Sequence, residues 1–193
     1  LGLDLGTGST AEPCGMQCTS GLTVGWTFSL ASAVRVDGLG VWDLDAGGLG
    51  VDVEVGLWNA AGSLLASTTI TPGSTPLASA HPGGRWLTQT VPSLTLGAGN
   101  YVIGSVFFED SPEGQVNPSF TTAAALIYGK PVWNSVISGL AMPATDFPGG
   151  ASGVFGPTLL LSPVPEPQAV ALLVSGLGVL GLMGGRRRKP IGA

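Results

Sequence analysis

Apolar residues alternate with small or polar residues through much of the first hundred residues, which is the periodicity of a half-buried β-strand. Residues 21–161 contain no long stretch with the apolar spacing of an amphipathic helix. The alternation is clearest at Leu22, Val24, Trp26, Phe28 and Leu30, and again at Val51, Val53, Val55 and Leu57. The chain is therefore predicted to be all-β.

Further strands are predicted over residues 34–41, 63–71, 86–91, 101–108 and 154–161. The alternation slips by one residue at Asp37-Gly38, which indicates a β-bulge. Residues 101–108 are apolar on both faces, as in a central strand, whereas Pro157 indicates an edge. Together with a turn at Asn59–Gly62, these short strands predict an antiparallel β-sandwich over residues 21–161, either jelly-roll or Ig-like.

The charge content excludes some classes of protein. Only 10% of residues are charged and the net charge is −5, so no basic surface is available to neutralise nucleic acid. Residues 1–163 hold 3 basic and 11 acidic residues, a net charge of −8, while the chain end is basic. The single histidine, His81, lies in a loop sequence and is expected to be a plain surface residue.

The basic end follows a long apolar segment. Residues 169–185 carry no charge. As a helix they would span about 26 Å, just short of a hydrocarbon core of about 30 Å. A transmembrane helix is predicted here, with a buried core helix as the alternative. The cations Arg186, Arg187, Arg188 and Lys189 would stop transfer within a cytoplasmic tail over 186–193, which places the body outside the cytoplasm.

A proline-rich linker over 162–168 precedes this segment and contains Val164, Pro165, Glu166 and Pro167. The two prolines hold the chain extended, as a protease needs. The order of Pro-Glu-Pro, apolar span, arginine cluster and chain end resembles the PEP-CTERM sorting signal. The resemblance implies export, transient membrane anchoring, processing near the motif by an exosortase-type membrane protease, and delivery to the cell surface or the extracellular matrix.

The body also resembles a β-sandwich domain common in exported PEP-CTERM proteins. The resemblance rests on runs such as Gly25-Trp26-Thr27-Phe28, Leu39-Gly40-Val41-Trp42-Asp43, Val55-Gly56-Leu57-Trp58-Asn59, Gly62-Ser63-Leu64-Leu65-Ala66 and Leu96-Gly97-Ala98-Gly99-Asn100-Tyr101. It implies a fold and no chemistry.

An N-terminal segment over residues 1–20 contains both cysteines, Cys14 and Cys18. Outside the cytoplasm an even cysteine count indicates a disulfide, although free thiols remain the alternative. An exported protein is expected to have a signal peptide. Leu1–Thr10 does not resemble one, so we expect this sequence to begin after the cleavage point or to be a fragment.

Calcium is the best cofactor hypothesis. Asp43, Asp45 and Glu54 partly fit the spacing of an EF-hand loop, but Gly47 stands where a ligand is needed and no helices flank the loop. An EF-hand is thus excluded. Two interpretations of this segment remain. It is a looser calcium site in a hairpin loop, or a glycine-rich hairpin whose acidic residues keep the domain soluble. No cofactor is otherwise expected.

No recognisable catalytic motif occurs in the sequence. The prediction is a non-catalytic, structural or adhesive protein at the cell surface or in extracellular polysaccharide. The alternatives are a carbohydrate-binding module, which would need exposed rings among Trp42, Trp58, Trp86 and Trp133, a secreted hydrolase, or a membrane protein that is never cleaved.

Overall fold

The computed structural model describes residues 1–7, 21–44, 46–107, 115–116, 119–135, 139–147 and 154–164. The chain divides into two units, Leu1–Ser162 and Pro163–Ala193. Within the described ranges the chain forms antiparallel strands and no helix, which confirms the all-β prediction. The predicted transmembrane helix over 169–185 lies outside these ranges.

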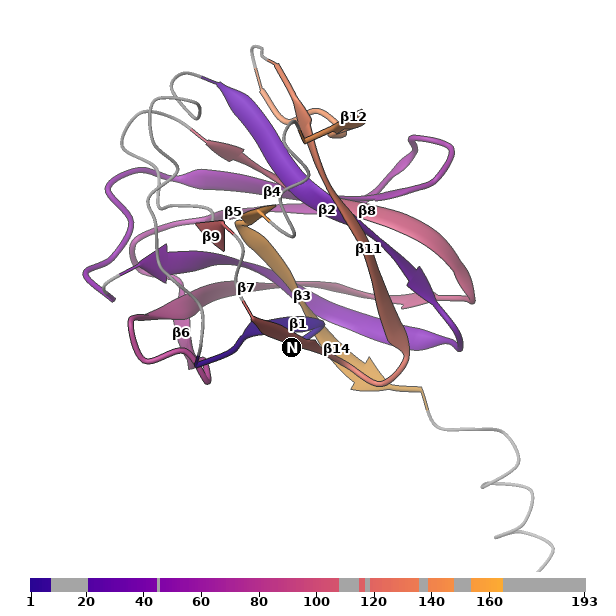
Figure 1. Cartoon of the computed structure of the whole chain (residues 1–193), viewed down its shortest axis with the longest axis horizontal. Helices are drawn as coiled ribbons and strands as arrows, with labels where there is room; N and C mark the ends of the chain where they lie inside the picture. Colours follow the sequence, from indigo (N-terminus) through magenta and orange to yellow (C-terminus); the bar gives the residue numbers. More distant parts are fainter. Residues whose placement is uncertain are drawn as a thin grey trace, which may run out of the picture. The chain divides into compact units, whose positions relative to one another are not determined.

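Most strands belong to two sheets (Figure 1). The larger sheet has the strand order β12-β11-β2-β8-β4-β5. Its strands are β2 (Leu22–Leu30), β4 (Val53–Asn59), β5 (Leu64–Ile70), β8 (Gly99–Phe107), β11 (Leu126–Asn134) and β12 (Thr145–Asp146).

The second sheet has four strands in the order β14-β3-β7-β6. They are β3 (Val34–Leu44), β6 (Thr75–Ala78), β7 (Gly84–Leu96) and β14 (Pro157–Pro163). Two short pairs complete the described part of the fold. They join β1 (Leu3–Leu5) to β10 (Phe120–Thr122), and β9 (Gln115–Val116) to β13 (Val154–Phe155).

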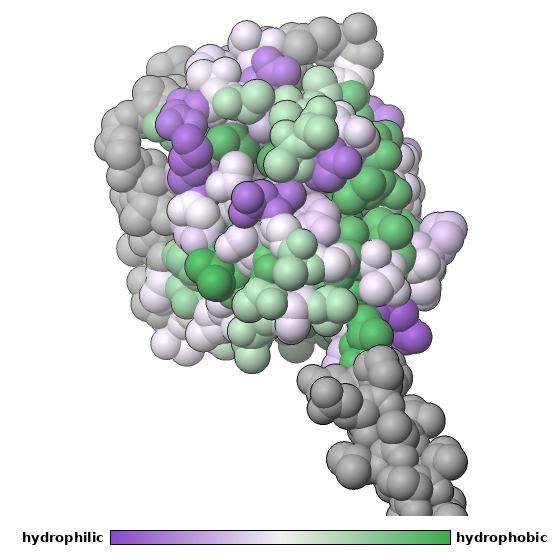
Figure 2. Space-filling view, turned by 90° about the vertical axis from the view of Figure 1, so that its right-hand side faces the viewer, coloured by the Kyte–Doolittle hydropathy of each residue, from purple (hydrophilic) through white to green (hydrophobic). Residues whose placement is uncertain are grey.

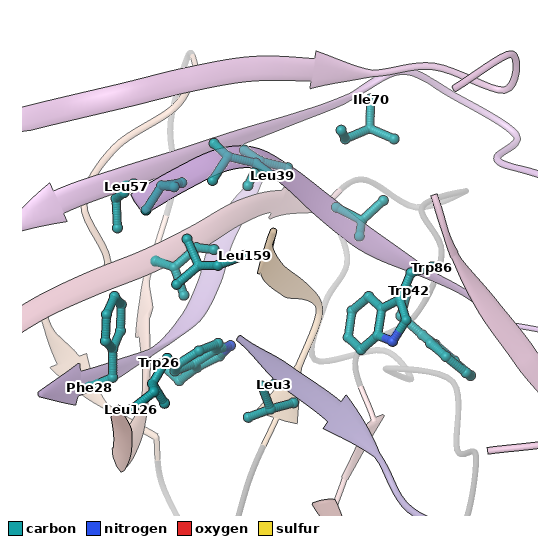
Figure 3. Packing of buried hydrophobic residues seen from close by; sticks show 14 of the residues in the cluster. Leu3, Trp26, Phe28, Leu39, Trp42, Leu57, Ile70, Trp86, Leu126 and Leu159 are labelled. Carbon is teal, nitrogen blue, oxygen red and sulfur yellow. The ribbon is translucent and has the colours of Figure 1, made fainter. Parts of the chain in front are cut away.

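One hydrophobic cluster joins the two large sheets. Trp26, Phe28 and Leu57 enter it from the six-stranded sheet (Figure 3). Leu39 and Trp42 enter it from the four-stranded sheet. On β2 and β4 the residues in this cluster are those that the alternation selects, because successive side chains point to opposite faces. On β3 the alternation is broken, since the neighbours Val41 and Trp42 are both buried in the cluster.

Several local predictions are confirmed. β8 is a central strand between β2 and β4, and β14 lies at an edge. In the turn at Asn59–Gly62, Asn59 Oδ1 accepts hydrogen bonds from the amides of Ala61 and Ser63. Gly62 has φ 86°, which favours glycine. The predicted bulge is also present, because the pairing of β3 with β7 shifts between Val36 and Gly38.

β7 is longer than predicted. The sequence indicates a short strand over residues 86–91, but β7 has 13 residues and ends at Leu96. Val91, Pro92 and Ser93 lie opposite the single residue Asp37, so the proline occupies a bulge and interrupts no regular ladder. β11 was not predicted from the sequence for the same reason. It contains Pro131, which lies at a bulge where the pairing with β2 shifts between Tyr128 and Pro131.

The core includes residues that precede the predicted start of the sandwich at residue 21. Leu3 and Leu5 on β1 are fully buried in the main cluster. β1 pairs with β10, more than a hundred residues later, and the amide of Gly2 donates to the carbonyl oxygen of Leu159 at 2.6 Å. This long-range pairing leaves no signal in a short run of sequence.

Three glycines form a row across the outer face of the six-stranded sheet. Gly104 on β8 pairs with Gly25 on β2 and with Gly56 on β4. A Cβ atom at Gly104 would lie 2.8 Å from Pro143 Cγ, so a later segment of the chain packs directly onto the row. Glycine is needed at each position for its own reason. A Cβ atom would clash with the backbone of β8 at Gly25, with Trp58 and Leu140 at Gly56, and with Pro143 at Gly104.

The surface reflects the low charge content. Figure 2 shows one side of the molecule, where strongly hydrophilic residues form small, separate patches among residues of intermediate hydropathy, and hydrophobic residues gather along the right-hand side of the view. Among the described residues, the large exposed apolar side chains are Leu64, Leu77 and Ile127, on three different strands. Single exposed apolar residues of this kind are normal for a folded domain.

Candidate functional site

The last strand of the body ends where the proline-rich linker begins. β14 runs antiparallel to β3, since a Cβ at Gly38 would meet Leu160 and the amide of Trp42 donates to the carbonyl oxygen of Gly156 at 2.9 Å. Thr158 and Leu159 are fully buried on this strand. The chain is thus held firmly by the core up to a few residues before the predicted sorting motif.

A polar cluster fixes the end of β14, and we call it the Ser162 clasp (Arg35, Asp37, Ser93 and Ser162). Ser162 Oγ donates to Asp37 Oδ2 at 2.6 Å, and Arg35 Nε donates to Ser162 Oγ at 3.0 Å. Ser93 Oγ donates to Asp37 Oδ1 at 2.7 Å, and Arg35 forms an ion pair with Asp37 at 2.9 Å. The bulge residue of β3 therefore holds the last residue of the body.

The charge of Asp37 suits this role. Hydrogen bonds from Ser162 and Ser93 lower the pKa of its carboxyl below the ordinary value, with a smaller contribution from Arg35 that adds to them. Partial desolvation opposes these effects without cancelling them. Asp37 is thus ionised at neutral pH and accepts a hydrogen bond from each serine hydroxyl group.

A second carboxylate ties the N-terminal strand to the loop before β7. Asp4 Oδ1 accepts hydrogen bonds from Ser79 Oγ at 2.6 Å and Trp86 Nε1 at 2.8 Å. Asp4 also accepts from the amides of Leu5 and Ala80. Burial acts to raise the pKa of Asp4, but these four hydrogen bonds outweigh it and the pKa is lowered. The sequence does not predict this role for Asp4, because three of its four hydrogen-bond donors lie 75 to 82 residues away.

His81 is not the surface residue that the sequence suggested. It is only 6% exposed, and its ring packs on Trp42 with a centroid distance of 5.6 Å. Among the described residues nothing hydrogen-bonds to its ring nitrogens. Ser79 Oγ donates to Asp4 and accepts from the backbone amide of His81 at 3.1 Å. The serine proton is thus committed to a carboxylate, which is not the geometry of an activated nucleophile.

The calcium candidates do not converge in the described structure. The Asp43 carboxylate is buried and accepts from Arg85 Nε at 2.8 Å and from the amide of Gly48 at 3.1 Å. Glu54 is exposed on β4, in the other large sheet. Asp45 lies outside the described residues. Within the described ranges no group of three or more His, Cys, Asp or Glu residues could hold a metal ion.

Tryptophan side chains serve mainly as core. Trp26, Trp42, Trp58 and Trp86 are at most 4% exposed. Trp133 is half-buried, and its Nε1 donates to the carbonyl oxygen of Asp146 at 3.1 Å. The exposed coplanar rings that a sugar-stacking surface would need are not formed by these residues.

The other predicted site residues lie mostly outside the described ranges. Val164 is half-buried directly after β14. Residues Pro165, Glu166 and Pro167, the basic residues Arg186–Lys189 and the cysteines Cys14 and Cys18 are not among those described. In the part of the chain that the structure does describe, no helix is long and apolar enough to cross a membrane.

The all-β fold and the end of its last strand at Pro163 define a class of protein, in which an all-β body is followed directly by a C-terminal signal segment. Residues 163–189 match the family model of the PEP-CTERM protein-sorting motif, so the chain carries that motif. No curated protein and no solved structure matches the chain significantly. The motif implies an exported protein that exosortase, a membrane protein, processes and sorts after transient anchoring, with the cell surface or the extracellular space as its destination.

The two lowered carboxyl pKa values predict how stability depends on pH. A carboxyl whose pKa is lower in the folded state than in the unfolded state adds stability above its unfolded value, here 3.8. That stability is lost as the pH falls through the folded pKa. We expect the free energy of unfolding to be nearly constant from pH 7 to about 5 and to fall below about pH 4.

Unfolding of the full chain in detergent, followed by tryptophan fluorescence between pH 7 and pH 2.5, measures this dependence. The double variant Asp4→Asn/Asp37→Asn is expected to be less stable at pH 7 and to lose less stability on acidification. The control Asp52→Asn alters an exposed carboxylate and is expected to follow the wild type. A double variant that loses as much stability on acidification as the wild type would contradict the assignment.

Proposed function

We propose that the protein is a non-catalytic β-sandwich, jelly-roll or Ig-like, that is anchored by a C-terminal transmembrane helix and released to the cell surface or the extracellular matrix. Exosortase-type processing near Val164–Pro167 separates the body from the anchor. The body then serves a structural or adhesive purpose in extracellular polysaccharide.

One observation carries this proposal: the boundary of the folded body coincides with the boundary of the sorting motif. The first compact unit ends at Ser162, and the matched motif begins at residue 163. A cut within Val164–Pro167 would therefore leave every described strand intact, because β14 ends at Pro163. Processing at this place releases a complete domain, as a sorting signal requires.

The Ser162 clasp supports the same conclusion. The indole of Trp26 donates from Nε1 to the carbonyl oxygen of Pro157 at 2.9 Å, which anchors the start of β14. Asp37 and Arg35 anchor its end through Ser162. The last strand is thus fixed at both ends by side chains of the body.

The non-catalytic assignment rests on how the body uses its polar groups. Asp4, Asp37 and Asp43 each hold two elements of the fold together through short hydrogen bonds. Ser79 is committed to Asp4. These groups stabilise the fold, and their occupied hydrogen-bonding positions support a structural purpose over hydrolysis.

The test is the intact mass of the protein from the host that produces it, measured in membrane and medium fractions. We expect a chain that ends near Val164–Pro167 and lacks residues 169–193. We propose Glu166 as a specificity contact for the protease, so Glu166→Gln is expected to reduce the processed fraction at least about tenfold, because removing one charge of a contact pair costs about 2 kcal/mol or more. Glu54→Gln, an exposed change on β4, serves as the control.

An uncut chain that retains Arg186–Lys189 and is found only in membranes would overturn the proposal. The protein would then be a permanently anchored membrane protein. Hydrolysis of polysaccharide by the purified body would instead overturn the non-catalytic assignment and leave the sorting proposal standing.

A further inference from the structure

The edge strands of the two large sheets are protected to very different degrees. An unpaired edge offers backbone N–H and C=O groups to any other chain, and proteins usually block it with charges, proline, bulges or a covering segment. In the four-stranded sheet β6 has only four residues and contains Pro76. On β14, Pro157 begins the strand and the amide of Gly2 bonds to Leu159. Both edges of this sheet are therefore blocked.

The six-stranded sheet has one blocked edge and one open edge. β12 is only two residues long and includes Asp146, which forms a 2.5 Å ion pair with Lys130. At the opposite edge, β5 has seven residues with neither a charge nor a proline. No strand of the described ranges pairs with its outer side.

The open part of β5 is regular. A bulge at Leu65 interrupts the start of the strand, since Trp58 pairs with Leu64 and Leu57 pairs with Ala66. From Ala66 to Ile70 the pairing with β4 continues without a break. Ser67 and Thr69 are exposed on this stretch. Five successive residues therefore form a regular strand edge whose outer side pairs with no strand of the described ranges.

The distribution of charged residues favours a second copy of this chain as the partner of the β5 edge. The sequence contains no Asp, Glu, Lys or Arg from Val55 to Gly84, a stretch that includes both β5 and β6. The whole chain has a net charge of −5, so two copies repel each other over most of their surface. They meet with the least repulsion at this uncharged edge. An antiparallel pair of identical strands is also compatible with a closed twofold interface.

We propose that two copies of this chain associate by antiparallel pairing of β5 with β5, which joins their six-stranded sheets into one. The seam consists of main-chain hydrogen bonds over Ala66–Ile70, flanked by the hydroxyl groups of Ser67 and Thr69. This association is a property of the body and does not depend on whether the sorting motif is cleaved. It gives an exported surface protein a defined way to assemble with itself.

The test compares three forms of the full chain in detergent by sedimentation velocity over increasing protein concentration. The edge variant Ser67→Lys/Thr69→Lys places like charges across the proposed seam. The matched control Gln89→Lys/Asn100→Lys adds the same two charges at exposed positions on the central strands β7 and β8. Thermal unfolding confirms that all three forms are folded.

We expect the wild type and the control to form dimers with similar affinity, and the edge variant to dimerise at least about tenfold more weakly. Hydrogen exchange of the amides in residues 66–70 is expected to slow as the protein concentration rises in both the wild type and the control. In the edge variant it is expected not to change with concentration. Dimers of equal affinity in all three forms would place the contact elsewhere, for example in the C-terminal segment, and would overturn the proposal. A wild type that stays monomeric throughout would overturn it as well.

Discussion

Asp4→Ala is expected to lower the free energy of unfolding by about 3 kcal/mol, because one carboxylate accepts four hydrogen bonds. One of the donors is the indole of Trp86, which is fully buried and would be left without an acceptor. The change would also free β1 from the loop at Ser79 and Ala80, so Leu3 and Leu5 would be held less firmly in the core. A loss of this size corresponds to a fall in Tm of roughly 6–12 °C for a body of this length.

Thermal unfolding of the full chain, followed by near-ultraviolet circular dichroism, measures the effect of Asp4→Ala. Asp52→Ala removes an exposed carboxylate and is expected to change Tm by no more than about 2 °C. Asp4→Asn is expected to fall between the two, since an amide oxygen still accepts hydrogen bonds but without charge. Equal stability of Asp4→Ala and Asp52→Ala would show that the Asp4 hydrogen bonds contribute nothing measurable.

Gly25→Ala is expected to destabilise the body by about 3 kcal/mol, although it adds a single methyl group. A Cβ atom at Gly25 would collide with the carbonyl oxygen of Ile103 and would lie 2.6 Å from the Cα of Gly104. Both groups belong to the backbone of β8, which is central in the six-stranded sheet. Since no side chain can rotate away to relieve this clash, the pairing of β2 with β8 must itself shift.

The matched control for this substitution is Gly97→Ala. A Cβ atom at Gly97 would have no neighbour within 4 Å, so the same methyl group is expected to change stability by less than about 0.5 kcal/mol. Urea unfolding of both variants gives the comparison. If Gly25→Ala were as stable as Gly97→Ala, the close approach of β2 and β8 at this position would be wrong.

Local sequence patterns predicted individual strands well where one face of the strand is buried. The alternation around Trp26 and Val55 marked β2 and β4, and the slip at Asp37 marked a real bulge. The predictions were poorer where proline lies inside a strand. Pro92 and Pro131 both lie at bulges, where the ladder hydrogen bond that proline lacks is not needed.

The sequence also predicted the segment that follows the folded body, although not the contacts that hold the end of the body. The sorting motif is recognisable as an order of short segments along the chain, and the match at residues 163–189 confirms it. The Ser162 clasp was not predictable, although its central residue Asp37 had been identified as a bulge. Its partners Ser93 and Ser162 lie 56 and 125 residues away from Asp37, and serine has no pattern that distinguishes a clasp from an exposed loop.

The sequence by itself determined the all-β class, the approximate positions of the regular strands and the C-terminal sorting motif. Each of these depends on neighbouring residues, through the period of two along a strand or the order of segments in a signal. Only the tertiary structure decided which strands pair, that β1 belongs to the core, that His81 is buried and that β5 is left as an open edge. These features depend on contacts between residues far apart in the chain, whose free energies are set by packing and by which backbone groups remain unpaired.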